Sequence, residues 1–252
     1  MNTGKSREWP PAAWLAELLG TALLVLAALS AIALTMAPAG PLHSWPITLR
    51  VAVIGVAVGG TVAVFAVSPP GKRSGAHLNP AVSLLMALRG VLSVRDTVAY
   101  AVAQLAGSVA GVLVARLLWG HWMRDVSDGV IRPGPGVGTA GTIVGETATS
   151  LVLLLVLSWL VSKPRPRETP WVIGAVILVL IVLTGTTSGG SFNPARDFGP
   201  YVLSGDFRYF WIYLLAPMVA ALLAAGGLRV AGAWKPRTCK LCDPAFGGVG
   251  VT

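Results

Sequence analysis

Two asparagine–proline pairs are the residues of this chain whose type and spacing point most clearly to a function. They are Asn79-Pro80-Ala81 and Asn193-Pro194-Ala195. An asparagine side chain caps a helix well, because its oxygen accepts a hydrogen bond from a free backbone N–H. Proline is favoured at the first helical position, so each pair predicts the start of a short helix. The amide NH2 of each asparagine then remains free to donate to a passing oxygen atom.

The segments around the two pairs repeat each other. Ser-Gly-Ala-His-Leu-Asn-Pro-Ala at 74–81 recurs as Ser-Gly-Gly-Ser-Phe-Asn-Pro-Ala at 188–195. Each copy also has a lone acid upstream in an apolar stretch, Glu17 in the first half and Glu146 in the second. Acids within the membrane are functional candidates, for example as proton relays. Their repeat-matched positions favour a structural role instead, in which each carboxylate caps loop amides.

Long apolar segments must position these residues. Hydrophobic residues make up 54% of the chain and charged residues 12%, whereas an ordinary soluble domain has about 25% charged residues. A spanning helix needs about 20 apolar residues, and every backbone amide in lipid must be satisfied within it. Six segments fit this description: 12–36, 46–68, 96–119, 139–162, 170–187 and 209–232. The first is longer than the roughly 7–15 residues of a signal-peptide core, so we expect it to be retained.

Two shorter stretches, 79–88 and 193–203, are only half as long as a spanning helix. Each repeat holds three spanning segments, an odd number, so the second repeat must be inverted relative to the first. The two short helices then enter from opposite faces and bring their N-termini together. Each N-terminus carries roughly half a positive charge. A passage between them would repel cations and suit small neutral polar molecules.

Topology explains the basic residues better than a polyanionic partner does. The formal net charge is +9, which in a soluble protein would suggest nucleic acid. Most of the 19 Lys and Arg residues fall on the cytoplasmic side if the N-terminus lies there, as the positive-inside rule requires. We therefore expect both termini in the cytoplasm, an irregular extracellular loop at 120–138, and no nucleic-acid partner.

The sequence has two Asn-Pro-Ala motifs, which we call the first box (Asn79-Pro80-Ala81) and the second box (Asn193-Pro194-Ala195), together with two acids and six apolar spans. In these features it resembles the major intrinsic protein family, the aquaporins and aquaglyceroporins, over about residues 12–232. The resemblance implies an all-α membrane fold of six transmembrane helices and two re-entrant half-helices. It implies one channel domain at 1–232, with repeats at about 12–119 and 139–232, and a cytoplasmic tail at 233–252. It also implies that Asn79 and Asn193 meet at the pore centre, that Glu17 and Glu146 brace the re-entrant loops, and that the protein is a cofactor-free homotetramer in the cell membrane.

The resemblance also implies a selectivity ring. Arg196 matches the family's arginine, and Ile181 and Gly190 match by their distance from the second asparagine. The second-helix member is Val56 if the preceding loop is three residues longer than usual, and Gly59 if it is not. None of these residues is aromatic, whereas the water-selective members of the family carry a Phe and a His beside the arginine.

Such a small apolar ring favours glycerol, urea or boric-acid-like solutes. Asp197 matches the glycerol-conducting branch of the family, whereas Tyr201 departs from the basic residue often found at its position. His77 could act as a pH gate, but the family has histidine there as a structural part of the loop. The passage is thus predicted to admit small uncharged solutes as well as water.

Three alternatives have different consequences. A water-selective aquaporin would reject glycerol, a proton- or ion-coupled secondary transporter would need Glu17 and Glu146 for coupling, and a non-conducting scaffold would pass no solute. The chain holds no nucleophile–base set, so we do not expect an enzyme. Cys239 and Cys242 could form half of a zinc site, but no second pair exists, so we expect no metal.

Overall fold

A computed structural model describes residues 11–162 and 167–232 of the chain. The described residues form helices and connecting turns, without strands. The long helices are α1 (Pro11–Met36), α2 (Ile47–Val67), α5 (Val94–Trp119), α7 (Thr139–Val161), α8 (Thr169–Thr184) and α10 (Phe210–Val230). The shorter elements are α3 (Pro69–Ser74), α4 (Pro80–Leu88), α6 (His121–Asp125), the 3-10 turn η1 (Ser127–Gly129) and α9 (Pro194–Ser204).

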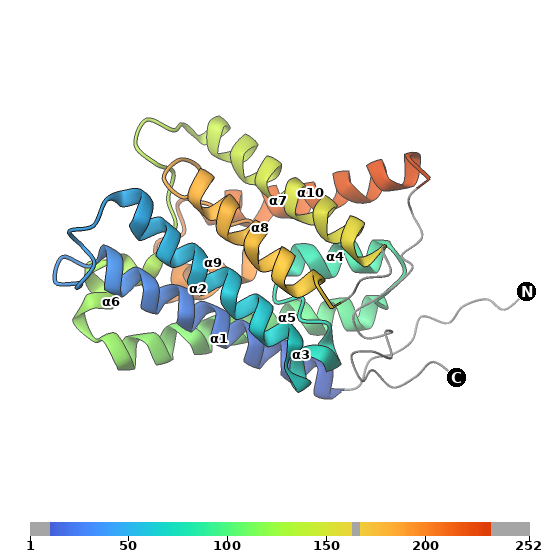
Figure 1. Cartoon of the computed structure of the whole chain (residues 1–252), viewed down its shortest axis with the longest axis horizontal. Helices are drawn as coiled ribbons and strands as arrows, with labels where there is room; N and C mark the ends of the chain where they lie inside the picture. The colour runs from blue at the N-terminus through green and yellow to red at the C-terminus, as the bar shows by residue number, and fades with distance from the viewer. Residues whose placement is uncertain (1–10, 163–166, 233–252) are drawn as a thin grey trace, which may run out of the picture.

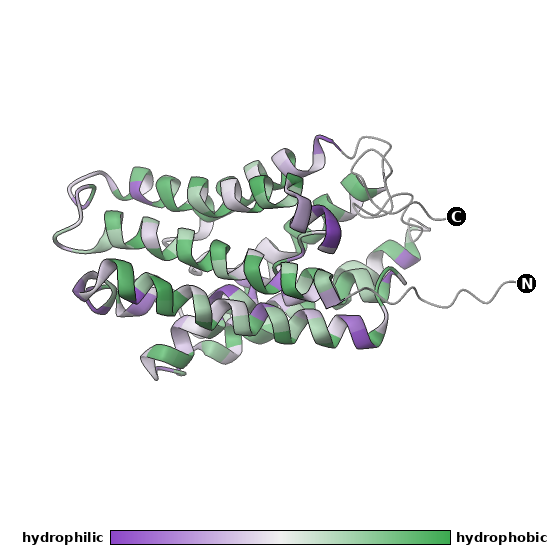
Figure 2. Ribbon diagram, turned by 90° about the horizontal axis from the view of Figure 1, so that it is seen from below, coloured by the Kyte–Doolittle hydropathy of each residue, from purple (hydrophilic) through white to green (hydrophobic). Residues whose placement is uncertain are grey.

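Of these described helices, five are long and apolar enough to cross a membrane, and α8 is a shorter apolar helix of 16 residues. Figure 2 shows hydrophobic colours along the long helices and hydrophilic colours mainly toward their ends. Many leucine and valine side chains on these helices are exposed at the protein surface. A surface of this kind is suited to lipid.

The packing of the helices follows the inverted repeat. Helix α1 packs along α5, and its counterpart α7 packs along α10, while α2 and α8 cross between the repeats. Each half-helix contacts the last long helix of the other repeat, α4 against α10 and α9 against α5. Helix α1 begins and α10 ends at the same end of the bundle, at the right of Figure 1. This arrangement confirms the predicted six-helix fold with two half-helices.

Local chemistry fixes where the half-helices begin. The Asn79 side-chain oxygen accepts a hydrogen bond from the Ala81 amide at 2.9 Å, and the Asn193 oxygen accepts one from the Ala195 amide at 3.0 Å. Proline occupies the first position of both helices, as predicted. Helix α9 ends at Ser204 and is followed by Gly205, whose positive φ of 74° suits a left-handed C-cap.

The loops hold more structure than the sequence predicted. Helix α3 occupies the segment expected to be a lengthened loop, because the Ser68 side chain caps it at Gly71 and proline stands in its first turn. The 120–138 loop, expected to be irregular, contains α6 and η1. Helix α8 ends at Thr184 rather than 187, since the next residues turn toward the second box. The predicted tail at 233–252, with Cys239 and Cys242, lies outside the described residues.

Helices α2 and α8 cross at two glycines. A Cβ atom on Gly59 would lie 2.2 Å from the Gly174 carbonyl oxygen, and one on Gly174 would lie 2.6 Å from the Gly59 carbonyl oxygen. Small residues at such crossings let two backbones approach closely within a membrane. Gly59 therefore packs against the α8 backbone at this crossing.

Gly59→Ala is expected to destabilise the protein by about 1–3 kcal/mol, the usual cost of overpacking. Gly60→Ala is the matched control, because a Cβ on Gly60 meets nothing within 4 Å. The control should be neutral or slightly stabilising, since alanine is the better helix former. Thermal unfolding in detergent measures both variants, and equal melting temperatures would contradict this account of the crossing.

Candidate functional site: a passage between the repeats

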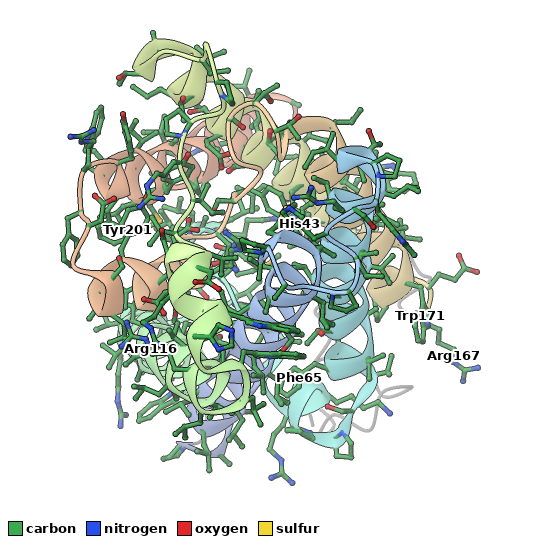
Figure 3. The ribbon with its side chains drawn as sticks, turned by 90° about the vertical axis from the view of Figure 1, so that its left-hand side faces the viewer. His43, Phe65, Arg116, Arg167, Trp171 and Tyr201 are labelled. Carbon is green, nitrogen blue, oxygen red and sulfur yellow. The ribbon has the colours of Figure 1, made fainter. Side chains whose placement is uncertain are left out.

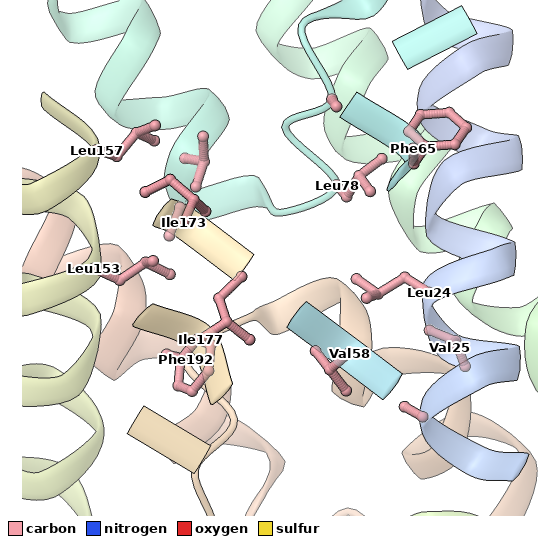
Figure 4. Packing of buried hydrophobic residues seen from close by; sticks show 14 of the residues in the cluster. Leu24, Val25, Val58, Phe65, Leu78, Leu153, Leu157, Ile173, Ile177 and Phe192 are labelled. Carbon is pink, nitrogen blue, oxygen red and sulfur yellow. The ribbon is translucent and has the colours of Figure 1, made fainter. Parts of the chain in front are cut away.

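A cavity of about 70 Å³ runs along the boundary between the two repeats. Its wall is built largely from aliphatic side chains at helical spacing, so that one stripe of each contributing helix faces the space. In Figure 4, Leu153 and Leu157 of α7 point toward the side chains of Ile177 and Ile173 of α8. The wall residues are Leu24, Val58, Val62, Val82, Met86, Leu153, Leu157, Val161, Ile173, Ile177 and Ile181 from the helices, with Gly75–Asn79, Gly190–Asn193 and Arg196 from the two boxes.

Asn79 and Asn193, the residues expected to meet at the pore centre, both line this cavity. Their amides also form a reciprocal clasp: Asn79 Nδ2 donates to the Phe192 carbonyl at 2.9 Å, and Asn193 Nδ2 donates to the Leu78 carbonyl at 2.8 Å. The amide NH2 groups predicted to be free for a passing oxygen are therefore partly occupied. An NH2 group has two donor hydrogens, so the clasp uses one from each asparagine and leaves one for a permeant.

Glu17 braces the first re-entrant loop from α1. Its carboxylate accepts hydrogen bonds from the His77 amide at 3.0 Å and the Leu78 amide at 2.7 Å, and from Gln104 Nε2 at 2.7 Å. The side chain is completely buried. Positive φ angles at Ala76 and Leu78 turn this part of the loop, which therefore has no regular helical partner for its amides.

Glu146 has the same role in the second repeat. Its carboxylate accepts hydrogen bonds from the Ser191 amide at 3.3 Å, the Phe192 amide at 2.8 Å and the Ser188 hydroxyl at 2.8 Å. Both acids thus contact loop amides in equivalent positions. This geometry agrees with the structural role that their repeat-matched placement favoured.

His77 lines the cavity beside the first box. Its Nδ1 lies 3.1 Å from Ser83 Oγ, and its ring packs edge-on against Tyr100 at 5.3 Å. Ser83 in turn accepts a hydrogen bond from Gln104 Nε2 at 3.1 Å. A network from α4 and α5 therefore fixes the orientation of this imidazole, which suits the structural role that the family resemblance implied.

Arg196 lies in the first turn of α9 and lines the same cavity. Its Nη1 donates to Asp197 Oδ1 at 3.2 Å. Asp197 is buried and also accepts a hydrogen bond from the Ser191 hydroxyl. A guanidinium has five donors, so Arg196 keeps donors for a permeant after making this contact.

The second-helix filter residue predicted from the sequence, Val56, is wrong. Its side chain is 59% exposed and does not line the cavity, and Gly59 is buried in the crossing with Gly174. Val58 is 6% exposed and lines the cavity, together with Val62 one turn later. The loop-length argument failed because it counts residues along the chain, whereas the crossing of α2 with α8 at Gly59 and Gly174 sets which face of α2 points at the cavity.

Ile181 and Gly190, the two residues assigned to the selectivity ring by their distance from Asn193, both line the cavity. Gly190 has a positive φ of 60°, and a Cβ there would lie 3.0 Å from Thr184 Oγ1. A larger residue would be strained at this position. Val58, Ile181, Gly190 and Arg196 therefore combine an aliphatic wall, a bare backbone and one cation.

The long loop after α5 folds back onto the second box. The buried Tyr201 hydroxyl donates to the Ile131 carbonyl, and the Gly134 amide donates to the Thr187 carbonyl at 2.6 Å. Figure 3 labels Tyr201 on this side of the molecule, with Arg116 nearby. A hydrogen bond from Arg132 lowers the pKa of the exposed Asp206. Tyr201 thus anchors the loop where the sequence showed only a departure from the family pattern.

Two features of the site were missed in the sequence. The α7 stripe Leu153, Leu157 and Val161 and the α8 residues Ile173 and Ile177 supply much of the wall. Their spacing of four was visible, but in helices that are apolar all round it does not identify the face that lines a cavity. Among residues 11–162 and 167–232, no group of three His, Cys, Asp or Glu side chains is placed to hold a metal ion.

Comparison with known proteins places these observations in context. A family model described as "Major intrinsic protein" matches residues 6–226. Aquaporin NIP1-1 of Zea mays is 34% identical over 223 residues, covering 87% of this chain and 72% of the relative. Probable aquaporin TIP2-2 of Oryza sativa subsp. japonica is 33% identical over 222 residues, covering 84% of each protein. The X-ray structure of the aquaglyceroporin from Plasmodium falciparum shares the fold, with a TM-score of 0.74, 24% identity and coverage of 89% of this chain and 98% of that one.

Proposed function

Because this chain belongs to the major intrinsic protein family, we propose that it is a passive channel for water and small uncharged solutes across a membrane. One observation carries the proposal: Asn79, Asn193 and Arg196 line a single cavity that continues to Met86 and Val161. A permeant in this space meets a few fixed donors spaced along an otherwise apolar wall. That arrangement orients a small neutral molecule without holding it strongly.

Ion exclusion follows from the same geometry. The first turns of α4 and α9 point their positive helix poles at the clasp between Asn79 and Asn193. Arg196 adds a full positive charge nearby. The aliphatic wall offers no ring of oxygen ligands to replace the hydration shell of an ion, so cations are both repelled and left unsolvated.

We propose that the solute class includes glycerol, urea or boric-acid-like molecules. The filter residues Val58 and Ile181 are aliphatic, and Gly190 has no side chain. An opening without aromatic rings leaves width for a solute larger than water, while Arg196 donates to its hydroxyl or carbonyl oxygen. A water-selective channel would need a narrower opening at this level.

A proton- or ion-coupled transporter is less well supported. Glu17 and Glu146 would have to exchange protons or bind ions, but each accepts two backbone N–H bonds and a third bond from a side chain. Neither lines the cavity. Coupling would therefore require both loops to be released in every transport cycle.

We extend the proposal to the cellular arrangement that the family resemblance implies. It comprises one channel domain over 1–232, both termini in the cytoplasm, and a homotetramer in the cell membrane. The common end at which α1 begins and α10 ends supports termini on one side (Figure 1). Chemical cross-linking in native membranes tests the tetramer, and protease accessibility in sealed vesicles tests the orientation.

Stopped-flow light scattering on proteoliposomes tests the central proposal. We expect water and glycerol to permeate faster than through protein-free liposomes, with no dependence on a proton or sodium gradient. Permeation of water alone would contradict the proposed solute class. A gradient dependence would favour coupled transport, and no permeation at all would indicate a non-conducting scaffold.

A further inference from the structure

Arg89 lies beside the inner end of the passage, the end away from Arg196. It follows α4 directly as its C-cap, one turn beyond the cavity-lining Met86. Its guanidinium donates to the Ser158 carbonyl at 3.4 Å and to the Ser162 hydroxyl at 3.2 Å. Val161, which lies between these two serines in the last turn of α7, also lines the cavity. The charge of Arg89 is therefore held beside the inner end of the wall.

This arginine is unusual because it is buried without an acid. It is 5% exposed, its Nε has no hydrogen-bond partner, and no carboxylate within the described parts of the chain forms an ion pair with it. Burying an unpaired charge is costly. Both of its bonds are long for a charged donor. These two bonds link the end of α4 to the end of α7, but they are too weak to explain by themselves why a guanidinium is buried there.

Two helix C-termini offer a stronger reason. Helix α4 ends at Leu88 and α7 ends at Val161, and Arg89 contacts the last turn of one and caps the other. Each C-terminus carries roughly half a negative charge. Two such poles at the inner mouth would attract cations toward the passage. The Arg89 guanidinium is carried by the C-cap residue of α4 and bonded to the last turn of α7, and its one positive charge is about what is needed to offset both poles.

We propose that Arg89 is a specificity-determining residue that keeps the inner mouth of the passage from concentrating cations. It acts through its field, since its donors are buried and do not contact the permeant. Arg196 repels cations at the outer end of the passage, and the paired N-termini of α4 and α9 repel them at its centre. Arg89 repels cations at the opposite end. The inference rests on the proposed channel function.

The local potential can be measured with a thiol at the mouth. In full-length protein carrying Cys239→Ser, Cys242→Ser and Val161→Cys, modification rates are compared for a trimethylammonium-bearing and a sulfonate-bearing methanethiosulfonate. The ratio of cationic to anionic rates, referred to a free thiol in solution, reports the sign of the potential. Arg89→Gln should raise this ratio about tenfold. Removing one positive charge beside the thiol speeds the reaction of the cationic reagent and slows that of the anionic one. Arg89→Lys keeps the charge and should leave the ratio unchanged.

Arg167→Gln is the matched control, since Arg167 is exposed and projects away from the body of the molecule in Figure 3. It should not change the ratio. An unchanged ratio in Arg89→Gln overturns the proposal, as does a Val161→Cys thiol that reacts with neither reagent. If Arg89→Gln does not fold, the Val161→Cys parent alone tests the proposal. Its thiol must then react faster with the anionic than with the cationic reagent, each rate taken relative to a free thiol, and the opposite preference overturns the proposal. Water permeability, measured separately, distinguishes a failure of this inference from a failure of the channel proposal.

Discussion

Val58→Phe combined with Ile181→His is expected to lower glycerol permeability roughly tenfold or more while water permeability persists, because pore diameter sets the largest solute admitted. Both residues line the cavity from facing helices, Val58 on α2 and Ile181 on α8. Two rings in place of two aliphatic side chains narrow the passage at both positions. Water still passes, since it is smaller and can accept from the Arg196 guanidinium. Stopped-flow scattering with glycerol and with an impermeant osmolyte separates the two permeabilities.

Val56→Phe combined with Ile181→His is the matched control. Val56 lies two residues from Val58 in the same helix, but its side chain is largely exposed at the protein surface. The control should behave like Ile181→His alone. If Val56→Phe blocks glycerol and Val58→Phe does not, the placement of the filter on α2 is wrong.

The contrast between these two valines shows how far the sequence could lead. The starts of α4 and α9 were predictable because helix capping is local: an asparagine oxygen and a proline suffice to define them. The braces at Glu17 and Glu146 were predictable because an acid in an apolar helix needs partners, and the repeat supplied equivalent ones. Each inference used chemistry contained in a few neighbouring residues.

The pore wall was less predictable because it depends on how whole helices cross. Helix α2 is apolar all round, so its sequence does not tell Val56 from Val58. The Gly59–Gly174 crossing decides which face points inward, and a partner in the other repeat sets that crossing. The clasp was missed for a related reason, because each asparagine donates to a carbonyl more than a hundred residues away.

Glu146→Ala is expected to cost about 2–6 kcal/mol of stability, because each buried donor left without a partner costs about 1–3 kcal/mol. The carboxylate is completely buried, and its loss would leave the Ser191 and Phe192 amides unsatisfied. Water permeability should fall as well, since Phe192 also carries the carbonyl to which Asn79 donates. Thermal unfolding in detergent and water flux in proteoliposomes measure the two effects.

Glu168→Ala serves as the control, because Glu168 is exposed at the start of α8 and should be tolerated. Glu17→Ala should resemble Glu146→Ala, since it exposes the equivalent amides of His77 and Leu78. A melting temperature near that of the parent in either Glu→Ala variant would show that the re-entrant loops do not depend on these carboxylates.

The clasp further predicts that the two braces are coupled. Leu78 receives a hydrogen bond from Asn193, and Phe192 receives one from Asn79, so a shift in either loop strains a bond anchored in the other. Groups that share partners depart from additivity, typically by about 0.5–3 kcal/mol. Once one carboxylate is removed and the clasp has loosened, removing the second carboxylate costs less stability than it would in the parent protein. The Glu17→Gln and Glu146→Gln double variant should therefore lose less stability than the sum of its single variants, and strict additivity would mean that the clasp does not link the two halves.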